Sequence, residues 1–96
     1  MSNAVCKLKI RDINYLEALG DYVKINVDEQ DHTIHSSLKT IEKKLPVDIF
    51  LRVHRSFIIN ISKIDKVEGK TLVINNNLIP VSDAYKADLN KRMNCW

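Results

Sequence analysis

Two arginines, a histidine and a serine lie within five consecutive positions of the chain, in the run Arg52-Val53-His54-Arg55-Ser56. A guanidinium can donate two parallel hydrogen bonds to the O6 and N7 atoms of guanine, or to a phosphate. The most apolar segment of the sequence, residues 57–61, follows directly. Charged side chains at the entrance of an apolar strand are out of place in a protein core. This run is therefore the first candidate for a functional site.

The same residues do not suggest catalysis or metal binding. His54 and Ser56 could act as a base and a nucleophile, but a full pleat separates second neighbours along a strand, and no third orienting group is recognisable. The three histidines, His32, His35 and His54, lack the spacing of a metal site. Two glycines cannot build a phosphate-binding loop. We expect no enzymatic activity, no metal and no cofactor.

Basic residues and helix-start serines fit nucleic-acid binding better. Residues 1–48 carry 7 basic and 8 acidic side chains, and residues 49–96 carry 8 and 4, so the second half favours an anionic partner. Each candidate could equally be an ordinary surface residue or helix cap, and no helix-turn-helix, zinc finger or RNP-like strand is present. The candidates near loops or element ends are Lys24, Lys39, Arg52, Arg55, Lys63 and Lys86, with Ser37 and Ser82 as neutral donors to phosphate.

Bulk properties predict one folded domain. The chain has 96 residues, of which 45% are hydrophobic, and only 2 are Gly and 2 Pro. No apolar run approaches the roughly 18 residues of a membrane span, and no signal peptide is visible. Residues 1–4 resemble an expression-tag remnant, which leaves residues 5–96 as the domain. Cys6 and Cys95 are expected to be reduced thiols of a cytoplasmic protein, although a bridge between them stays open.

Short strands with tight turns dominate the expected secondary structure. Residues 22–27 alternate apolar and polar side chains, which is typical of a half-buried strand. Asn75-Asn76-Asn77 is a turn of residues that tolerate positive φ, and Pro80 predicts that its strand lies at a sheet edge. Hairpin connections of this kind favour antiparallel sheets. The expected strands cover residues 13–18, 22–27, 32–35, 50–61, 71–74 and 78–81.

Two helices complete the expected fold. Ser37 begins a helix of about two turns that Pro46 ends, and Ser82 caps a final helix. Their apolar stripes are Leu38, Ile41 and Leu45 in the first, and Tyr85, Leu89 and Met93 in the second. The fold class is therefore mainly β, with two short helices.

Several motifs resemble one family. Residues 50–60 resemble the F-x-R-x-H-R-S-[FY]-[IL]-[IV]-N core of LytTR-type DNA-binding domains, the output domains of many bacterial response regulators. The resemblance covers about residues 9–93. Its further pieces, in order, are residues 12–18 (D-I-x-Y-I-E-A), 20–24 (G-[ND]-Y-[VT]), 37–39 followed by Leu45 (S-L-K…L), and 79–82 (I-P-V-S).

The resemblance implies an elongated stack of small antiparallel sheets that reads duplex DNA with loops set into successive major grooves. In that arrangement the strand at 57–61 anchors a loop that presents Arg55 to bases. The base-contacting residues it implies are Asp21, Tyr22, Lys24 and Arg55. The phosphate-contacting residues are Ser37, Lys39, Arg52, His54, Lys63, Ser82 and Lys86, with the alternative that Arg52 and His54 brace the loop instead.

One position departs from the family pattern. Members often carry arginine within two residues of the I-P-V-S serine, whereas Asp83 and Ala84 stand here. Asp83 suits a helix N-terminus but repels phosphate. Either Lys86 supplies the third contact or this region binds DNA weakly.

The implied role is sequence-specific binding to duplex DNA with repeated half-sites, in the output domain of a cytoplasmic two-component regulator that carries an N-terminal receiver domain. A different class of function remains open. The exposed edge at residues 78–81 could instead accept a partner strand, which would make the chain a protein-interaction module.

Overall fold

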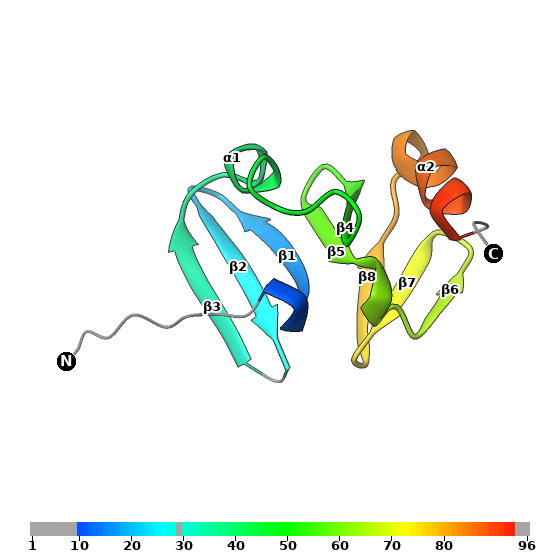
Figure 1. The fold of residues 1–96 in the computed structure, drawn as a ribbon, viewed down its shortest axis with the longest axis horizontal. Helices are drawn as coiled ribbons and strands as arrows, with labels where there is room; N and C mark the ends of the chain where they lie inside the picture. Colours follow the sequence, from blue (N-terminus) through cyan, green and yellow to red (C-terminus); the bar gives the residue numbers. More distant parts are fainter. Residues whose placement is uncertain (1–9, 29, 94–96) are drawn as a thin grey trace.

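The computed structural model describes residues 10–28 and 30–93, so Cys6, Cys95 and the predicted tag remnant lie outside the described residues. It confirms a mainly β fold with two helices, elongated to 45 × 23 × 22 Å (Figure 1). No helix in the described ranges is long and apolar enough to cross a membrane. The strands are β1 (Ile13–Leu19), β2 (Tyr22–Val27), β3 (Gln30–His35), β4 (Phe50–His54), β5 (Phe57–Asn60), β6 (Lys66–Glu68), β7 (Thr71–Ile74) and β8 (Asn77–Pro80); the α-helices are α1 (Leu38–Glu42) and α2 (Asp83–Met93); short 3-10 turns cover Ile10–Asp12 and Ile61–Lys63.

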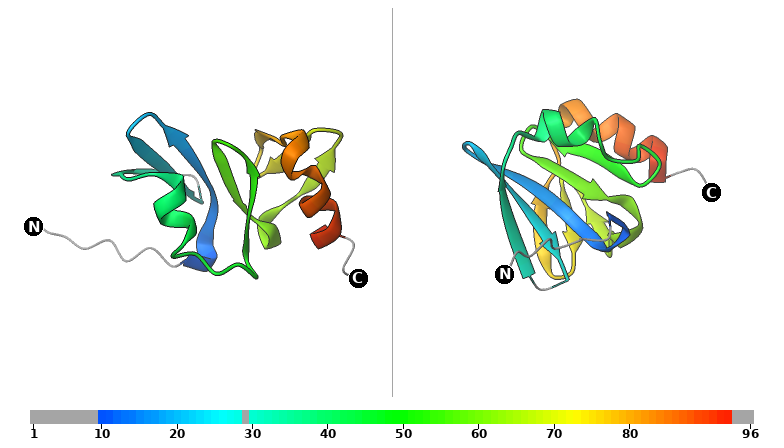
Figure 2. Two further views of the ribbon diagram at one scale, coloured as in Figure 1. Left: turned by 90° about the horizontal axis from the view of Figure 1, so that it is seen from above. Right: turned by 60° about the vertical axis from the view of Figure 1, so that its left-hand side comes forward.

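Two antiparallel sheets follow each other along the long axis (Figures 1 and 2). The first has five strands in the order β3-β2-β1-β5-β4, and the second has three in the order β6-β7-β8. Short turns join β1 to β2, β2 to β3, β4 to β5, β6 to β7 and β7 to β8, whereas α1 lies between β3 and β4. Strand β1 also pairs with β5, which is distant in the sequence. The predicted edge position of Pro80 is confirmed, since β8 borders its sheet.

Apolar side chains cover both faces of the five-stranded sheet around β1 and β5. On one face, Leu16 and Ile58 pack with Leu38 of α1. On the other face, Tyr15 and Ile59 pack with the three-stranded sheet and with Leu89 of α2. Successive residues of a strand point to opposite faces, so β5 is buried on both sides. A strand covered on both faces needs a continuous apolar run, which explains the composition of residues 57–61.

Buried asparagines supply polar links that sequence patterning did not predict. Asn26 stands on the polar face of the predicted alternation but is buried, where it accepts a hydrogen bond from Asn14 at 2.8 Å. Asn60 is fully buried, and its amide donates to the carbonyl of Ile13 at 2.9 Å while its oxygen accepts from the amide of Ser62 at 3.0 Å. An amide side chain that satisfies backbone groups in this way can be buried without a large free-energy cost.

Some predicted boundaries were wrong. The strand expected at 50–61 is interrupted by a turn at Arg55-Ser56, where the family resemblance implied a loop, so this segment forms the hairpin of β4 and β5. The asparagine turn has two residues rather than three, because Asn77 already belongs to β8. The α1 helix ends at Glu42, earlier than predicted, although single-turn hydrogen bonds continue to Leu45. Strand β6 was not expected, since its three residues are all exposed.

The turn between β7 and β8 gives a first test of the fold. Asn75 and Asn76 have φ values of 49° and 65°, the pattern of a type I′ hairpin, which prefers glycine at its second position. We expect Asn76→Gly to raise the free energy of unfolding by about 0.5 kcal/mol, because glycine adopts the left-handed conformation without the strain that a side chain causes. Thermal unfolding should shift upward by about 2–4 °C. The control Asn76→Ala should shift it downward; stabilisation by alanine would contradict the turn assignment.

Candidate nucleic-acid interface

Four segments at the ends of strands and the starts of helices lie along one side of the molecule. Strand β1 runs antiparallel to both β2 and β5, so its end at Leu19 lies beside the starts of these two strands. The turn at Gly20-Asp21 and the turn at Arg55-Ser56 therefore lie at the same end of the sheet. A hydrogen bond of 2.8 Å from the amide of Ala18 to the carbonyl of Ser56 connects them.

Both α-helices begin on this same side. Strand β3 ends at His35 opposite Tyr22, so α1 starts beside the first turn. The amide of Ser82 donates to the carbonyl of Val53 at 2.8 Å, which ties the start of α2 to the end of β4. We call this side the upper edge: it comprises residues 20–22, 35–39, 54–56 and 82–86, and it is uppermost in Figure 1.

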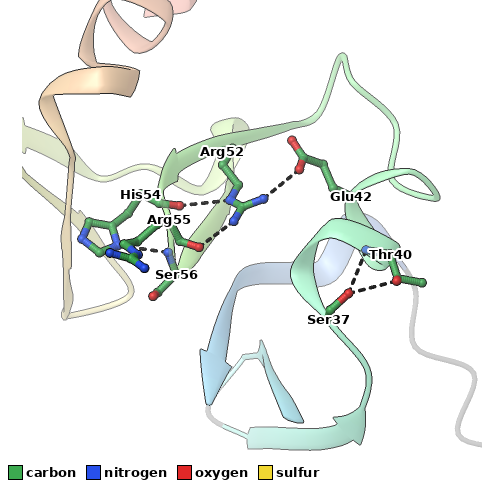
Figure 3. Close-up of polar contacts among 7 residues, drawn as sticks. All are labelled: Ser37, Thr40, Glu42, Arg52, His54, Arg55 and Ser56. Atoms are coloured by element: carbon green, nitrogen blue, oxygen red, sulfur yellow. Dashed lines mark hydrogen bonds and ion pairs between the residues drawn. The ribbon is translucent and has the colours of Figure 1, made fainter. Parts of the chain in front are cut away.

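Arg55 lies at the tip of the β4–β5 turn and is exposed. Among the described residues its guanidinium has no hydrogen-bond or ion-pair partner, while its backbone carbonyl accepts a hydrogen bond of 2.5 Å from Nη2 of Arg52 (Figure 3). The backbone of the tip is thus fixed and the charged head is free. This is the arrangement that a group reading an external partner requires.

Arg52 holds the turn from within the hairpin. Its Nε donates to the carbonyl of His54 at 3.1 Å, and its Nη1 pairs with Oε1 of Glu42 on α1 at 2.9 Å (Figure 3). With the bond to the Arg55 carbonyl, all three guanidinium nitrogens are engaged, and only 20% of the side chain is exposed. These contacts support the bracing alternative for Arg52 over the predicted phosphate contact.

His54 has a similar internal role. Its Nδ1 accepts a hydrogen bond of 3.0 Å from the backbone amide of Ser56, which closes the turn (Figure 3). Its ring meets Phe57 edge-on, with the ring centroids 5.7 Å apart. The bond to Ser56 involves the backbone N–H rather than the hydroxyl, so this pair is not arranged as a base and a nucleophile. Bracing is again better supported than a phosphate contact.

The first turn presents two of the predicted base-contacting residues. Gly20 adopts a φ of 61°, a left-handed conformation that glycine adopts without strain. Asp21 and Tyr22 after it are exposed. The ring of Tyr22 packs edge-on against His35 at 5.2 Å, which brings His35 to the upper edge. Sequence reasoning missed this placement of His35, and the only available signal was the expected hairpin register.

Lys24, the remaining predicted base contact, is held by neighbours on its own sheet. Its Nζ lies 3.1 Å from Oε1 of Glu17 and 5.7 Å from the centre of the Tyr15 ring. Burial alone lowers the pKa of Lys24, but its hydrogen bond to Glu17, reinforced by charges including Asp31, raises that pKa overall. A base contact by Lys24 requires it to leave Glu17, so the structure supports this role less than that of Arg55.

The predicted phosphate contacts at α1 lie on the upper edge. Ser37 caps the helix: its oxygen accepts from the amide of Thr40 at 3.2 Å and its hydroxyl donates to Oγ1 of Thr40 at 2.9 Å (Figure 3). Lys39 in the first turn of α1 is exposed and has no ion-pair partner within the described ranges. Lys39 is therefore the better placed of the two for a phosphate.

The start of α2 keeps some positive charge in spite of Asp83. Asp83, which departs from the family pattern, lies 3.2 Å from Nζ of Lys70. This exposed pair offsets the carboxylate charge that would repel a phosphate. Lys86 is half-buried on α2 with no salt bridge in the part of the chain that is described. Ser82 and Lys86 thus lie four residues apart at the start of α2, where residues 82–86 include no arginine.

Lys63 is separated from the other candidates. It follows β5, whose end lies at the opposite side of the sheet from the Arg55 turn. There it lines a polar pocket of about 250 Å³ with Asn14, Asp28, Asp65 and Asn75. Its predicted phosphate contact gains no support from this position.

Comparisons with known proteins agree with the motifs found in the sequence. A family model described as "LytTr DNA-binding domain" matches residues 3–94. The sensory transduction protein LytT of Bacillus anthracis is 30% identical over 97 residues, which are 95% of this chain and 39% of the relative. The protein of the same name from Bacillus subtilis (strain 168) is 32% identical over 87 residues, or 84% of this chain and 36% of the relative.

A solved structure shares the fold. It is the "LytTr DNA-binding domain of putative methyl-accepting/DNA response regulator from Bacillus cereus", with a TM-score of 0.80 and 32% identity, covering 91% of this chain and 85% of that one. The chain spans about two fifths of the length of the LytT relatives. Because the family model covers nearly the whole sequence and the fold agrees, the chain belongs to the LytTr DNA-binding domain family.

Proposed function

We propose that this chain binds duplex DNA sequence-specifically through the upper edge, in the control of transcription. The observation that carries the proposal is Arg55, whose exposed guanidinium has no partner among the described residues while its backbone is held by Arg52. Two parallel donors of this kind match the O6 and N7 atoms of guanine in the major groove. Asp21 and Tyr22 add a second group of base contacts from the neighbouring turn.

The shape of the molecule supports contacts in more than one groove. Its long axis measures 45 Å, which exceeds the roughly 34 Å that separate successive major grooves on one face of B-DNA. The upper edge runs along this axis from α1 to α2. Loops rather than a recognition helix would enter the grooves, since α1 has five residues and α2 packs along β4.

Phosphate contacts flank these turns in the proposed complex. Lys39 and Ser37 act at one end of the upper edge, and Lys86 and Ser82 at the other. Such contacts position the protein and carry little sequence information. Arg52 and His54 act on the DNA indirectly, by holding the turn.

Lys39→Ala tests the phosphate assignment. We expect affinity for specific and unrelated duplexes to fall by similar factors, because the lost contact does not read a base. The slope of log affinity against log salt concentration should become shallower by about 1. The matched control is Lys63→Ala, which removes the same charge at the opposite side of the sheet and should leave the slope unchanged. An unchanged slope for Lys39→Ala would refute its role.

The larger context is also a proposal. The LytT relatives are named sensory transduction proteins and are more than twice as long as this chain. We propose that residues 5–96 form the output domain of a cytoplasmic two-component response regulator with an N-terminal receiver domain. We further propose that its operator contains repeated half-sites. Mass analysis of the natural gene product, and footprinting on selected duplexes, would test these two points separately.

A further inference from the structure

The described chain has four strands at sheet edges, and three of them are protected against pairing. On β4, the carbonyl of Val53 accepts a hydrogen bond from the amide of Ser82, and α2 packs along the strand. Strand β6 has three residues and carries the exposed pair Lys66–Glu68. Strand β8 contains Pro80, which lacks an N–H. Natural proteins use such devices to prevent association between sheet edges.

Strand β3 lacks a covering helix and a proline, and Asp31 is its one charged side chain besides the two histidines. It is six residues long and contains no proline, lysine or arginine, and its register with β2 is regular from Gln30 to His35. Five of its six residues are exposed. A long, regular and uncovered edge is a template for pairing with another strand.

The register shows which backbone groups of β3 are available. Two residues connect Val27 to Gln30, so this pair closes the hairpin with its own hydrogen bonds. Alternate residues of an antiparallel strand turn their N–H and C=O groups to the same side. The groups of Asp31, Thr33 and His35 therefore point away from β2, toward solvent.

These three positions are complementary to themselves. When two β3 strands align antiparallel about Thr33, each Asp31 faces His35 of the second copy, and the two Thr33 residues face each other. All outward N–H and C=O groups then meet a partner. Oδ1 of Asp31 already accepts a hydrogen bond from Nδ2 of Asn26. The other carboxylate oxygen of Asp31 can therefore accept a hydrogen bond from the opposing imidazole. Side chains that face each other fall on the same side of the sheet, as pairing requires.

We propose that a second copy of this chain pairs with β3 in this antiparallel register, which joins the two five-stranded sheets into one continuous sheet. The two-fold axis runs perpendicular to the sheet, midway between the two Thr33 residues. Because the axis reverses strand direction, the upper edges of the two copies point in opposite directions. The pair therefore presents its two upper edges to separate DNA segments and does not place both on adjacent half-sites.

Sedimentation of the free protein tests the pairing without DNA, so its outcome is independent of the proposed function. A single strand pair gives an interface at the small end of the known range, so concentrations from about 10 µM to about 1 mM are needed. We expect the average mass to rise from monomer toward dimer across this range. Thr33→Lys should abolish the rise, because it places two like charges opposite each other on the axis.

The matched control is Leu78→Lys, which adds the same charge to the edge strand β8 at a side chain that is 73% exposed. It should leave the association unchanged. A monomer at all concentrations would overturn the proposal, as would association that survives Thr33→Lys or is abolished by Leu78→Lys. In support, hydrogen exchange should slow with concentration at the amides of Asp31, Thr33 and His35; unchanged exchange at these amides in an associating sample would place the interface elsewhere.

Discussion

Replacing Arg55 by alanine is expected to weaken binding to the specific duplex by about 1–3 kcal/mol, which corresponds to roughly 5- to 150-fold in affinity. The loss should fall on discrimination at one base pair of each half-site, because a bidentate guanidinium reads a single guanine. Folding should be unaffected, since the side chain is exposed and makes no contact with a partner in the described structure. Competition titrations against duplexes changed at single positions measure this effect.

Arg55→Lys is the matched variant for charge. Lysine keeps the positive charge but cannot donate two parallel hydrogen bonds from a planar group. Affinity for unrelated duplexes should therefore stay near that of the wild type, while discrimination at the same base pair falls. Equal discrimination by Arg55→Lys and the wild type would show that Arg55 contributes only its charge.

Arg52→Ala should reduce specific binding about as much as Arg55→Ala, although Arg52 is not expected to touch DNA. It removes the hydrogen bonds that hold the carbonyls of His54 and Arg55. Three interactions of a largely buried guanidinium are lost, so we also expect the free energy of unfolding to fall by about 2 kcal/mol. Chemical denaturation and the same duplex panel measure the two effects separately.

Two further variants separate bracing from direct contact. Glu42→Gln removes only the exposed ion pair with Arg52 and should cost at most about 0.5 kcal/mol of stability. The double variant Arg52→Ala with Arg55→Ala should lose little more specificity than either alone, because both disable the same reading group. Additive losses would show that Arg52 makes a DNA contact of its own, which is what its predicted role as a phosphate-contacting residue requires.

The fold could be predicted in outline because its local signals agree. Alternation in β2, the asparagine turn before β8 and the serine before each helix each follow from short-range physics. The turn at Arg55-Ser56 was implied only by the family resemblance, because the local pattern favours one uninterrupted strand. It depends on the hydrogen bonds of Arg52 and His54, which form only when the hairpin closes. The burial of Asn26 and Asn60 likewise depends on partners distant in the sequence.

The same distinction between short-range signals and long-range contacts applies to the residues of the candidate site. Arg55, Asp21 and Tyr22 were predicted from a resemblance in local motifs, and the structure places all three on the upper edge. Their roles toward DNA remain predictions. Residue type alone could not show that Glu17 holds Lys24, or that Lys63 lies at the other end of β5. Those facts follow from strand direction and register, which a list of basic residues does not contain.

Methylation interference on duplexes selected from a random pool tests the central claim most directly. A methyl group on guanine N7 blocks a bidentate arginine in the major groove. If the braced turn presents Arg55 to a guanine, methylation of one guanine per half-site should weaken binding of the wild type and have no effect on Arg55→Ala. The same interference pattern for both proteins would contradict the account, because the guanine would then be read by another residue.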